Sequence, residues 1–78
     1  MHLTQEELTI IQNLAKVGGT GNVMEFLNLG PQEYDIGFSI ANAMQNKDLV
    51  KMLYSNFNKN LIVVETTLLG YNASKFNN

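Results

Sequence analysis

The stretch from residue 30 to residue 50 constrains the fold most strongly, because it predicts one helix with a defined start and a defined end. Pro31 suits the first helical position after Gly30, since proline has no amide hydrogen to donate there and its φ is already near the helical value. The periodicity breaks at residues 46–48, and a strand-like run begins at Leu49. We therefore expect a long helix that runs directly into a β-strand.

This predicted helix has a broad apolar face made of two neighbouring lines at helical spacing. The lines are Tyr34, Phe38, Ala41 and Gln45, and Ile36, Ile40, Ala43 and Met44. We expect the core stripe to be Tyr34, Phe38, Ile40, Ala41 and Met44. The opposite face carries Gln32, Asp35, Ser39, Asn42 and Asn46. Gly37 costs about 1 kcal/mol relative to alanine inside a helix, so we expect it to allow the close approach of another helix.

An earlier helix is predicted to begin at Thr4. The Thr4 hydroxyl can accept from the amide of Glu7 while the Glu7 carboxylate accepts from the Thr4 amide, which is a capping box. Leu3 and Leu8 flank the cap as a hydrophobic staple. Apolar residues recur at Leu8, Ile11, Leu14 and Ala15, with Ile10 and Val17 one face over. Two glycines at 18 and 19 end this helix.

A short second helix is predicted after Asn22, which is a good N-cap residue, and it ends near residues 28–30. The glycine-rich run at 18–21 has the composition of a phosphate-binding loop. Such a loop needs a preceding strand and a lysine followed by serine or threonine after its last glycine. Here a helix precedes, and Asn22 and Val23 follow, so we interpret the run as a turn.

After residue 48 the apolar period changes to that of strands. Residues 49–54 and 61–66 are rich in strand-forming side chains, and an asparagine-rich loop at 55–60 separates them. This pattern predicts an antiparallel hairpin, which is marginal alone and must therefore pack on the helices. Residues 67–73 predict a short last helix or turn. We expect one domain over residues 1–73 and a frayed tail at 74–78.

Composition excludes several classes of function. The chain has 78 residues, a formal charge of −2, five basic residues that are all lysine, and no cysteine. The absence of cysteine excludes disulfides, thiolate catalysis and sulfur-containing zinc sites. His2 is the single histidine, and we find no nucleophile–base pair and no cofactor motif. We therefore expect no enzyme activity, no metal, no cofactor and no small-molecule substrate. No membrane span or signal peptide is predicted, so we expect a cytoplasmic protein.

The order of predicted elements and three local strings resemble winged helix-turn-helix domains of the MarR-like transcription regulators. MQNKDLV at 44–50 is similar to the end of the recognition helix and the start of the wing in those families. VETTLLGYNA at 64–73 is similar to the segment after the wing, and residues 23–29 are similar to the short second helix. The resemblance implies an α+β winged-helix fold, with three helices followed by an antiparallel β-hairpin wing and a short C-terminal turn or helix.

The resemblance also implies a DNA-binding transcription regulator that inserts the polar face of the third helix into operator DNA. The implied DNA-contacting residues are Gln32, Asp35, Ser39, Asn42, Lys47, Lys51, Asn58, Lys59 and Asn60, with Glu33, Ile36 and Asn56 at neighbouring positions. We expect a homodimer, because one such module buries little surface and two half-sites multiply the affinity.

The charge pattern also supports a different hypothesis. Glu33 and Asp35 would approach the phosphates first, and the chain lacks arginine, the preferred bidentate reader of guanine and phosphate. The alternative is a winged-helix module that binds protein rather than DNA, in which Phe57 of the predicted loop would contact the partner. An accessory protein of phage or mobile-element origin is a further version of this alternative.

Overall fold

The computed structural model describes residues 2–56 and 58–76 and shows an α+β fold. Over those residues the element order is α1 (Gln5–Lys16), β1 (Thr20–Asn22), α2 (Val23–Phe26), the 3₁₀ turn η1 (Pro31–Glu33), α3 (Tyr34–Asn46), β2 (Val50–Ser55), β3 (Ile62–Thr66) and α4 (Leu68–Phe76). None of the helices in the described part of the chain combines the length and the apolar content that crossing a membrane requires.

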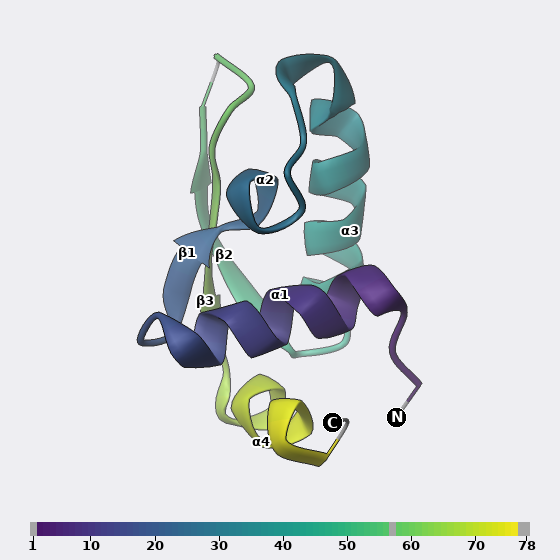
Figure 1. Cartoon of the computed structure of the whole chain (residues 1–78), viewed down its shortest axis with the longest axis vertical. Helices are drawn as coiled ribbons and strands as arrows, with labels where there is room; N and C mark the ends of the chain where they lie inside the picture. The colour runs from purple at the N-terminus through teal and green to yellow at the C-terminus, as the bar shows by residue number, and fades with distance from the viewer. Residues whose placement is uncertain (1, 57, 77–78) are drawn as a thin grey trace.

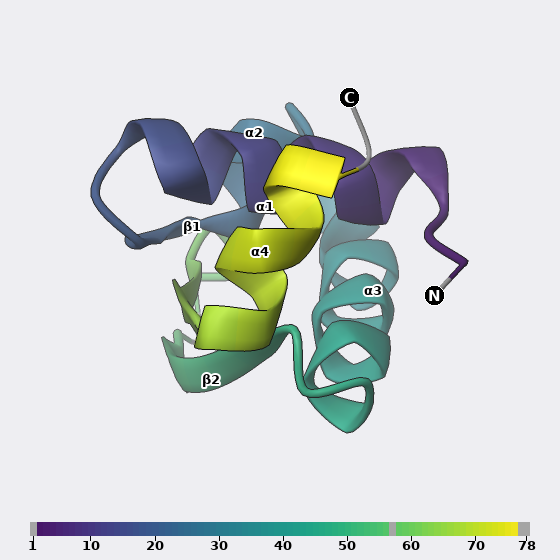
Figure 2. The same cartoon turned by 90° about the horizontal axis from the view of Figure 1, so that it is seen from below.

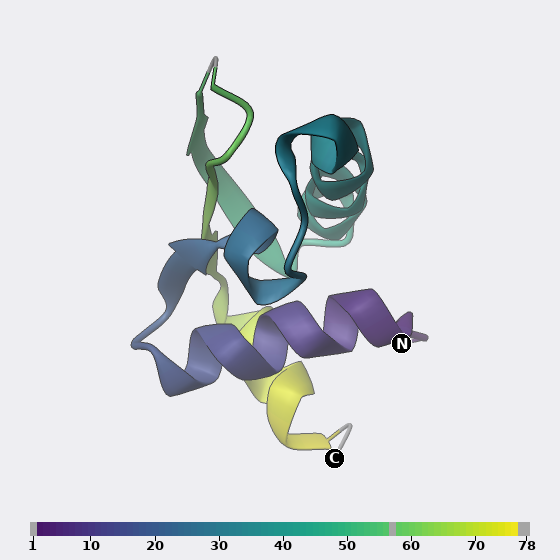
Figure 3. The same cartoon turned by 45° about the horizontal axis from the view of Figure 1, so that its top comes forward.

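The strands form a three-stranded antiparallel sheet in the order β1-β3-β2. Helices α1, α2 and α3 lie on one side of this sheet, and α4 lies beneath α1 (Figures 1 and 3). Seen from below, α4 crosses α1 near the end of the molecule that is away from the hairpin tip (Figure 2). One face of the sheet is therefore covered by helices and the other is open.

Helix α1 begins as predicted, because its start is determined by neighbouring residues. Thr4 Oγ1 accepts from the Glu7 amide at 3.1 Å, and Glu7 Oε1 accepts from the Thr4 amide at 3.0 Å, which confirms the capping box. Val17, one face over from the main apolar stripe, is 55% exposed. Val17 is the C-cap, and the chain turns away directly after it through Gly18 and Gly19, both with positive φ.

Strand β1 was not predicted from the sequence. It is only three residues long, Thr20 to Asn22, and its residues are not strong strand formers. It exists because β3 offers it a partner edge, with Gly21 opposite Val64. The Thr66 amide extends this ladder by donating to the Gly19 carbonyl at 2.7 Å. The short strand carries the chain from the end of α1 back across the sheet into α2.

The core lies between the covered face of the sheet and the three helices. Its buried apolar residues are Ile10, Ile11, Leu14, Val23, Met24, Ala41, Met44, Leu49, Val50, Ile62 and Val64. The prediction for Gly37 is confirmed: a Cβ there would lie 2.8 Å from Met24 Sδ and 3.2 Å from Leu29 Cδ1. Close packing against α2 and the segment after it therefore needs a residue without a side chain at this position.

The apolar face of α3 is narrower than predicted. Ala41 and Met44 are buried, and Tyr34 and Ile40 are half-buried against the core. Phe38 is 39% exposed, so the prediction that it belongs to the core is wrong, and Ile36 is 54% exposed. The cause is that α3 packs on its neighbours along a single line centred on Gly37, Ala41 and Met44, so residues on either flank of that line face water. The helix also begins later than predicted, because Pro31 opens the 3₁₀ turn η1.

The predicted antiparallel hairpin is confirmed, with β2 and β3 close to the expected bounds. The register shifts between Met52 and Tyr54, which leaves Leu53 as an extra residue on the edge strand β2. Gln45 of α3 accepts from the Met52 amide at 2.8 Å. A side chain from α3 thus covers a donor on this strand, where an exposed edge would favour pairing with other chains.

Helix α4 is longer than the predicted last helix or turn. Thr67 caps it, since its hydroxyl accepts from the Gly70 amide at 3.0 Å. The helix continues to Phe76, and Ser74 is buried with its hydroxyl donating to the Tyr71 carbonyl at 2.6 Å. The helix thus extends three residues past residue 73, where we expected the tail to begin. Tertiary packing of α4 against α1 holds residues whose polar composition alone predicts a frayed tail.

Candidate functional site

The molecule has two ends with different surfaces. We call residues 30–39, 55–56 and 58–61 the tip end, since η1, the first turns of α3 and the described part of the hairpin loop lie together there (Figure 1). We call α1, α4 and residues 44–50 the base. The described chain both begins and ends at the base.

Helix α3 presents a polar row that runs from the tip end toward the base. Gln32, Asp35, Ser39 and Asn42 are all exposed. Within the described residues none of these four side chains has a hydrogen-bond or ion-pair partner. Gln32 belongs to η1 and the other three to α3, and the exposed Ile36 lies on one flank of this row, one helical turn from Ser39. The row is thus free to contact a partner along about two turns of helix.

The hairpin loop is built from asparagine side chains. Asn56 Oδ1 accepts from the Leu61 amide at 3.0 Å, and Asn56 Nδ2 donates to Asn60 Oδ1 at 2.7 Å. Asn22 ties this loop to α2: its Oδ1 accepts from the amides of Met24 and Ile62, and its Nδ2 donates to the Asn60 carbonyl. Asn60, predicted to contact DNA, is therefore also a structural residue of the loop. The sequence identified Asn22 only as a helix cap.

Two predicted residues of the loop remain available for contact. Asn58 and Lys59 are exposed, and Lys59 has a positive φ of 59° in the turn. No described carboxylate pairs with the Lys59 ammonium. Phe57, predicted as a protein contact, lies outside the described residues. Asn58 and Lys59 thus extend the surface offered by the row on α3.

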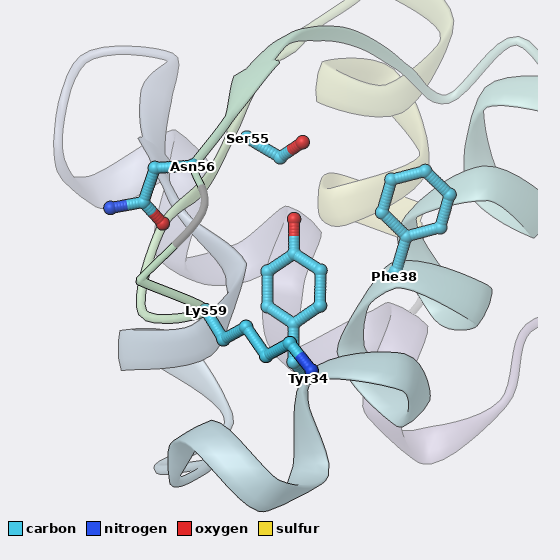
Figure 4. A pocket seen from close by; sticks show the side chains of 5 residues that line it. All are labelled: Tyr34, Phe38, Ser55, Asn56 and Lys59. Carbon is cyan, nitrogen blue, oxygen red and sulfur yellow. The ribbon is translucent and has the colours of Figure 1, made fainter.

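A cleft of about 410 Å³ separates α3 from the hairpin. It is lined by Tyr34 and Phe38 of α3 and by Ser55, Asn56 and Lys59 of the hairpin (Figure 4). The rings of Tyr34 and Phe38 are 6.1 Å apart between centroids and inclined by 35°. Sequence reasoning missed this cleft, although an aromatic pair four residues apart beside a polar row is a signal for it.

Lys47, predicted to contact DNA, is paired inside the base. Its Nζ lies 2.9 Å from both carboxylate oxygens of Glu7, whose side chain is only 4% exposed. Burial raises the pKa of Glu7, but the hydrogen bond from Lys47, the cap bonds from Thr4 and the charge of Lys47 outweigh it and hold the pKa below the ordinary value of 4.5. Lys47 therefore neutralises a buried charge and is not a free cation for phosphate.

Lys51, also predicted to contact DNA, faces the opposite side of the sheet from α3. It alternates with Val50 and Met52, which pack against the core, so its side chain points to the open face. Its partner across the strands is Glu65, which is also exposed. The structure therefore brings Gln32, Asp35 and Ser39 to the same end as Asn58, Lys59 and Asn60. Asn42 follows further along the same face of α3, and Lys47 and Lys51 are separated from this surface.

Searches of protein-family models, of curated proteins and of solved structures found no match to this chain. Over residues 2–56 and 58–76, no group of three or more histidine, cysteine or acidic side chains is arranged to hold a metal ion.

Proposed function

We propose that this chain is a winged helix-turn-helix DNA-binding domain of a transcription regulator. The hairpin of β2 and β3 would be the wing and α3 the recognition helix. The element order and the sheet order β1-β3-β2 support this proposal by analogy of fold. The single observation that carries it is the exposed polar row of α3 standing beside the hairpin tip, at the end of the molecule that the rest of the chain leaves uncovered.

The row has the dimensions and the groups that the major groove accepts. An α-helix fits that groove, and the N-terminal residues of a recognition helix contact base edges. Gln32, Ser39 and Asn42 supply donors and acceptors for those edges. Asn58 and Lys59 of the hairpin tip then lie where a wing contacts the phosphate backbone.

The proposed DNA-binding surface carries few positive charges, so we expect it to make few contacts with phosphates. Lys59 is the one lysine at the tip end within the described residues, and Lys47 is neutralised by Glu7. Each phosphate contact contributes about −0.9 to the slope of log affinity against log salt, so we expect a slope of about −1 for each copy. Such a module gains most of its affinity from pairing two copies on two half-sites, and we propose a homodimer on DNA.

The test is a fluorescence-anisotropy titration at low salt with duplexes selected from a random pool. Asn42→Ala should weaken binding about tenfold, which matches the removal of one bidentate base contact. Asn72→Ala is the matched control, since Asn72 is an exposed helical asparagine on α4 at the base, and it should leave binding unchanged. Absence of any binding at tens of micromolar protein would overturn the proposal.

A second candidate function is docking of a protein segment in the cleft between α3 and the hairpin. The observation that favours it is the aromatic wall formed by the half-buried Tyr34 and the exposed Phe38, with Lys59 also lining the cleft. Such a cleft fits an apolar side chain followed by a carboxylate. Phe38→Ala would abolish capture of a protein partner and leave DNA affinity unchanged, whereas Asn42→Ala would do the reverse. Equal capture by the wild type and Phe38→Ala would refute this candidate.

A further inference from the structure

Ile36 is an exposed aliphatic side chain on one flank of the polar row, beside Ser39. It is 54% exposed on α3, although the helix buries its apolar residues along a different line. Its neighbour one turn away is Ser39, and Asn42 follows one turn beyond Ser39. Packing of the described chain does not use this side chain, so it is available to an apolar group on a partner.

The major-groove edge of DNA offers one such apolar group, the C5-methyl of thymine. Adenine offers an acceptor and a donor side by side, which match the amide of asparagine or glutamine in a bidentate pair. The row therefore carries an aliphatic group for thymine and two amides, Gln32 and Asn42, for adenine. Asp35 is the exception in the row, since a carboxylate accepts from the exocyclic amino group of cytosine.

A preference for G·C pairs would need side chains that read guanine, and the row lacks the usual ones. Guanine is read most often by arginine or lysine, which donate to its O6 and N7. The chain contains no arginine, and the lysine at the end of α3, Lys47, donates to Glu7 instead. With few phosphate contacts available, the base edges decide most of the binding.

We infer that the row on α3 reads A·T base pairs in the major groove, with Ile36 against thymine methyl groups and Asn42 and Gln32 on adenine. This inference rests on the proposed DNA-binding function and names its target class. Ile36 is then the residue that distinguishes thymine from a pyrimidine without the methyl group.

The experiment compares three duplexes of equal length: one rich in A·T pairs, the same duplex with deoxyuridine replacing thymidine, and one rich in G·C pairs. Deoxyuridine keeps every hydrogen-bonding group and removes only the methyl. Wild-type protein should bind the deoxyuridine duplex about fourfold more weakly for each thymine methyl that Ile36 covers, and the G·C duplex more weakly still.

Ile36→Ala should bind the thymidine and deoxyuridine duplexes equally. Val17→Ala is the matched control: Val17 is a similarly exposed aliphatic residue at the base, and its variant should keep the wild-type preference. Equal binding of wild type to all three duplexes would overturn the inference and leave the proposed DNA binding intact. Absence of binding to every duplex would overturn both. A preference for thymidine that survives Ile36→Ala would exclude Ile36 as its source.

Discussion

The base and the tip end use polar residues in opposite ways. At the base, Glu7 and Lys47 pair with each other across 40 positions of sequence, and Thr67 bonds to the Asp48 and Leu49 carbonyls. At the tip end, the polar row of α3 faces water without partners among the described residues, and the asparagines of the loop bond to one another. The base satisfies its polar groups within the fold, whereas the tip end keeps those of the row available.

This contrast explains how a chain this small can be stable and still carry a contact surface. A domain of about 60 to 80 residues has only a marginal core. At the base, the Lys47–Glu7 pair joins the end of α3 to α1, and Thr67 joins the start of α4 to residues 48 and 49. The identity of exposed residues at the tip end can then be set by contact with a partner, because substitutions at exposed positions change the free energy of unfolding little.

The largest effect on stability is expected from Gly70→Ala at the base. A Cβ at Gly70 would overlap the Leu49 carbonyl oxygen, which is backbone and cannot move aside, and would lie 2.9 Å from Thr66 Oγ1. We expect the free energy of unfolding to fall by about 3 kcal/mol, measured by urea denaturation.

Gly30→Ala at the tip end is the control for this substitution. Gly30 has a φ of −86°, and a Cβ there would meet only the flexible side chain of Gln32. The change should stay within about 0.5 kcal/mol. If the two variants unfold at the same urea concentration, the base is not the more tightly packed end.

Lys47→Met is expected to have the next largest effect. It leaves the buried carboxylate of Glu7 without its cation, while the exposed part of Lys47 limits the effect, so we expect a decrease of about 2 kcal/mol at neutral pH. The double variant Glu7→Gln with Lys47→Met should recover part of this decrease. Equal stability of Lys47→Met and wild type would show that the pair contributes nothing.

The same pair predicts a pH dependence. Because the folded-state pKa of Glu7 is lower than its ordinary value of 4.5, the carboxylate contributes stability that is present above pH 4.5 and is lost as the pH falls through the lower folded-state pKa. Urea unfolding at several pH values should therefore show a steeper acid decrease in wild type than in Glu7→Gln. Parallel curves for the two proteins would contradict this assignment.

The smallest of these effects is expected from Asn22→Ala, which disconnects the hairpin loop from α2. It removes a helix cap and two bonds to the loop, and we expect a decrease of about 1.5 kcal/mol with faster hydrogen exchange at the Ile62 amide. Asn58→Ala, at an exposed position of the same loop, should change neither quantity. Unchanged exchange at Ile62 in Asn22→Ala would mean that this anchor does not hold the loop.

The sequence predicted those features that depend on residues close together in the chain. The Thr4–Glu7 capping box, the turn at Gly18 and Gly19, the Asn22 cap and the antiparallel hairpin all follow from local chemistry and periodicity. The outward direction of Gln32, Asp35, Ser39 and Asn42 also followed from helical spacing, and the structure shows all four exposed.

Contacts between residues that are far apart in the sequence were visible only in the folded molecule. Strand β1 exists because β3 lies beside it, Ser74 is buried because α4 packs on α1, and Phe38 is exposed because α3 contacts its neighbours along a narrow line. The ion pair of Lys47 was not predicted for the same reason: no local pattern shows that its ammonium pairs with the carboxylate of Glu7, 40 residues earlier. Sequence periodicity tells which way a side chain points from its own helix, and only the packing of helices and strands tells what it meets there.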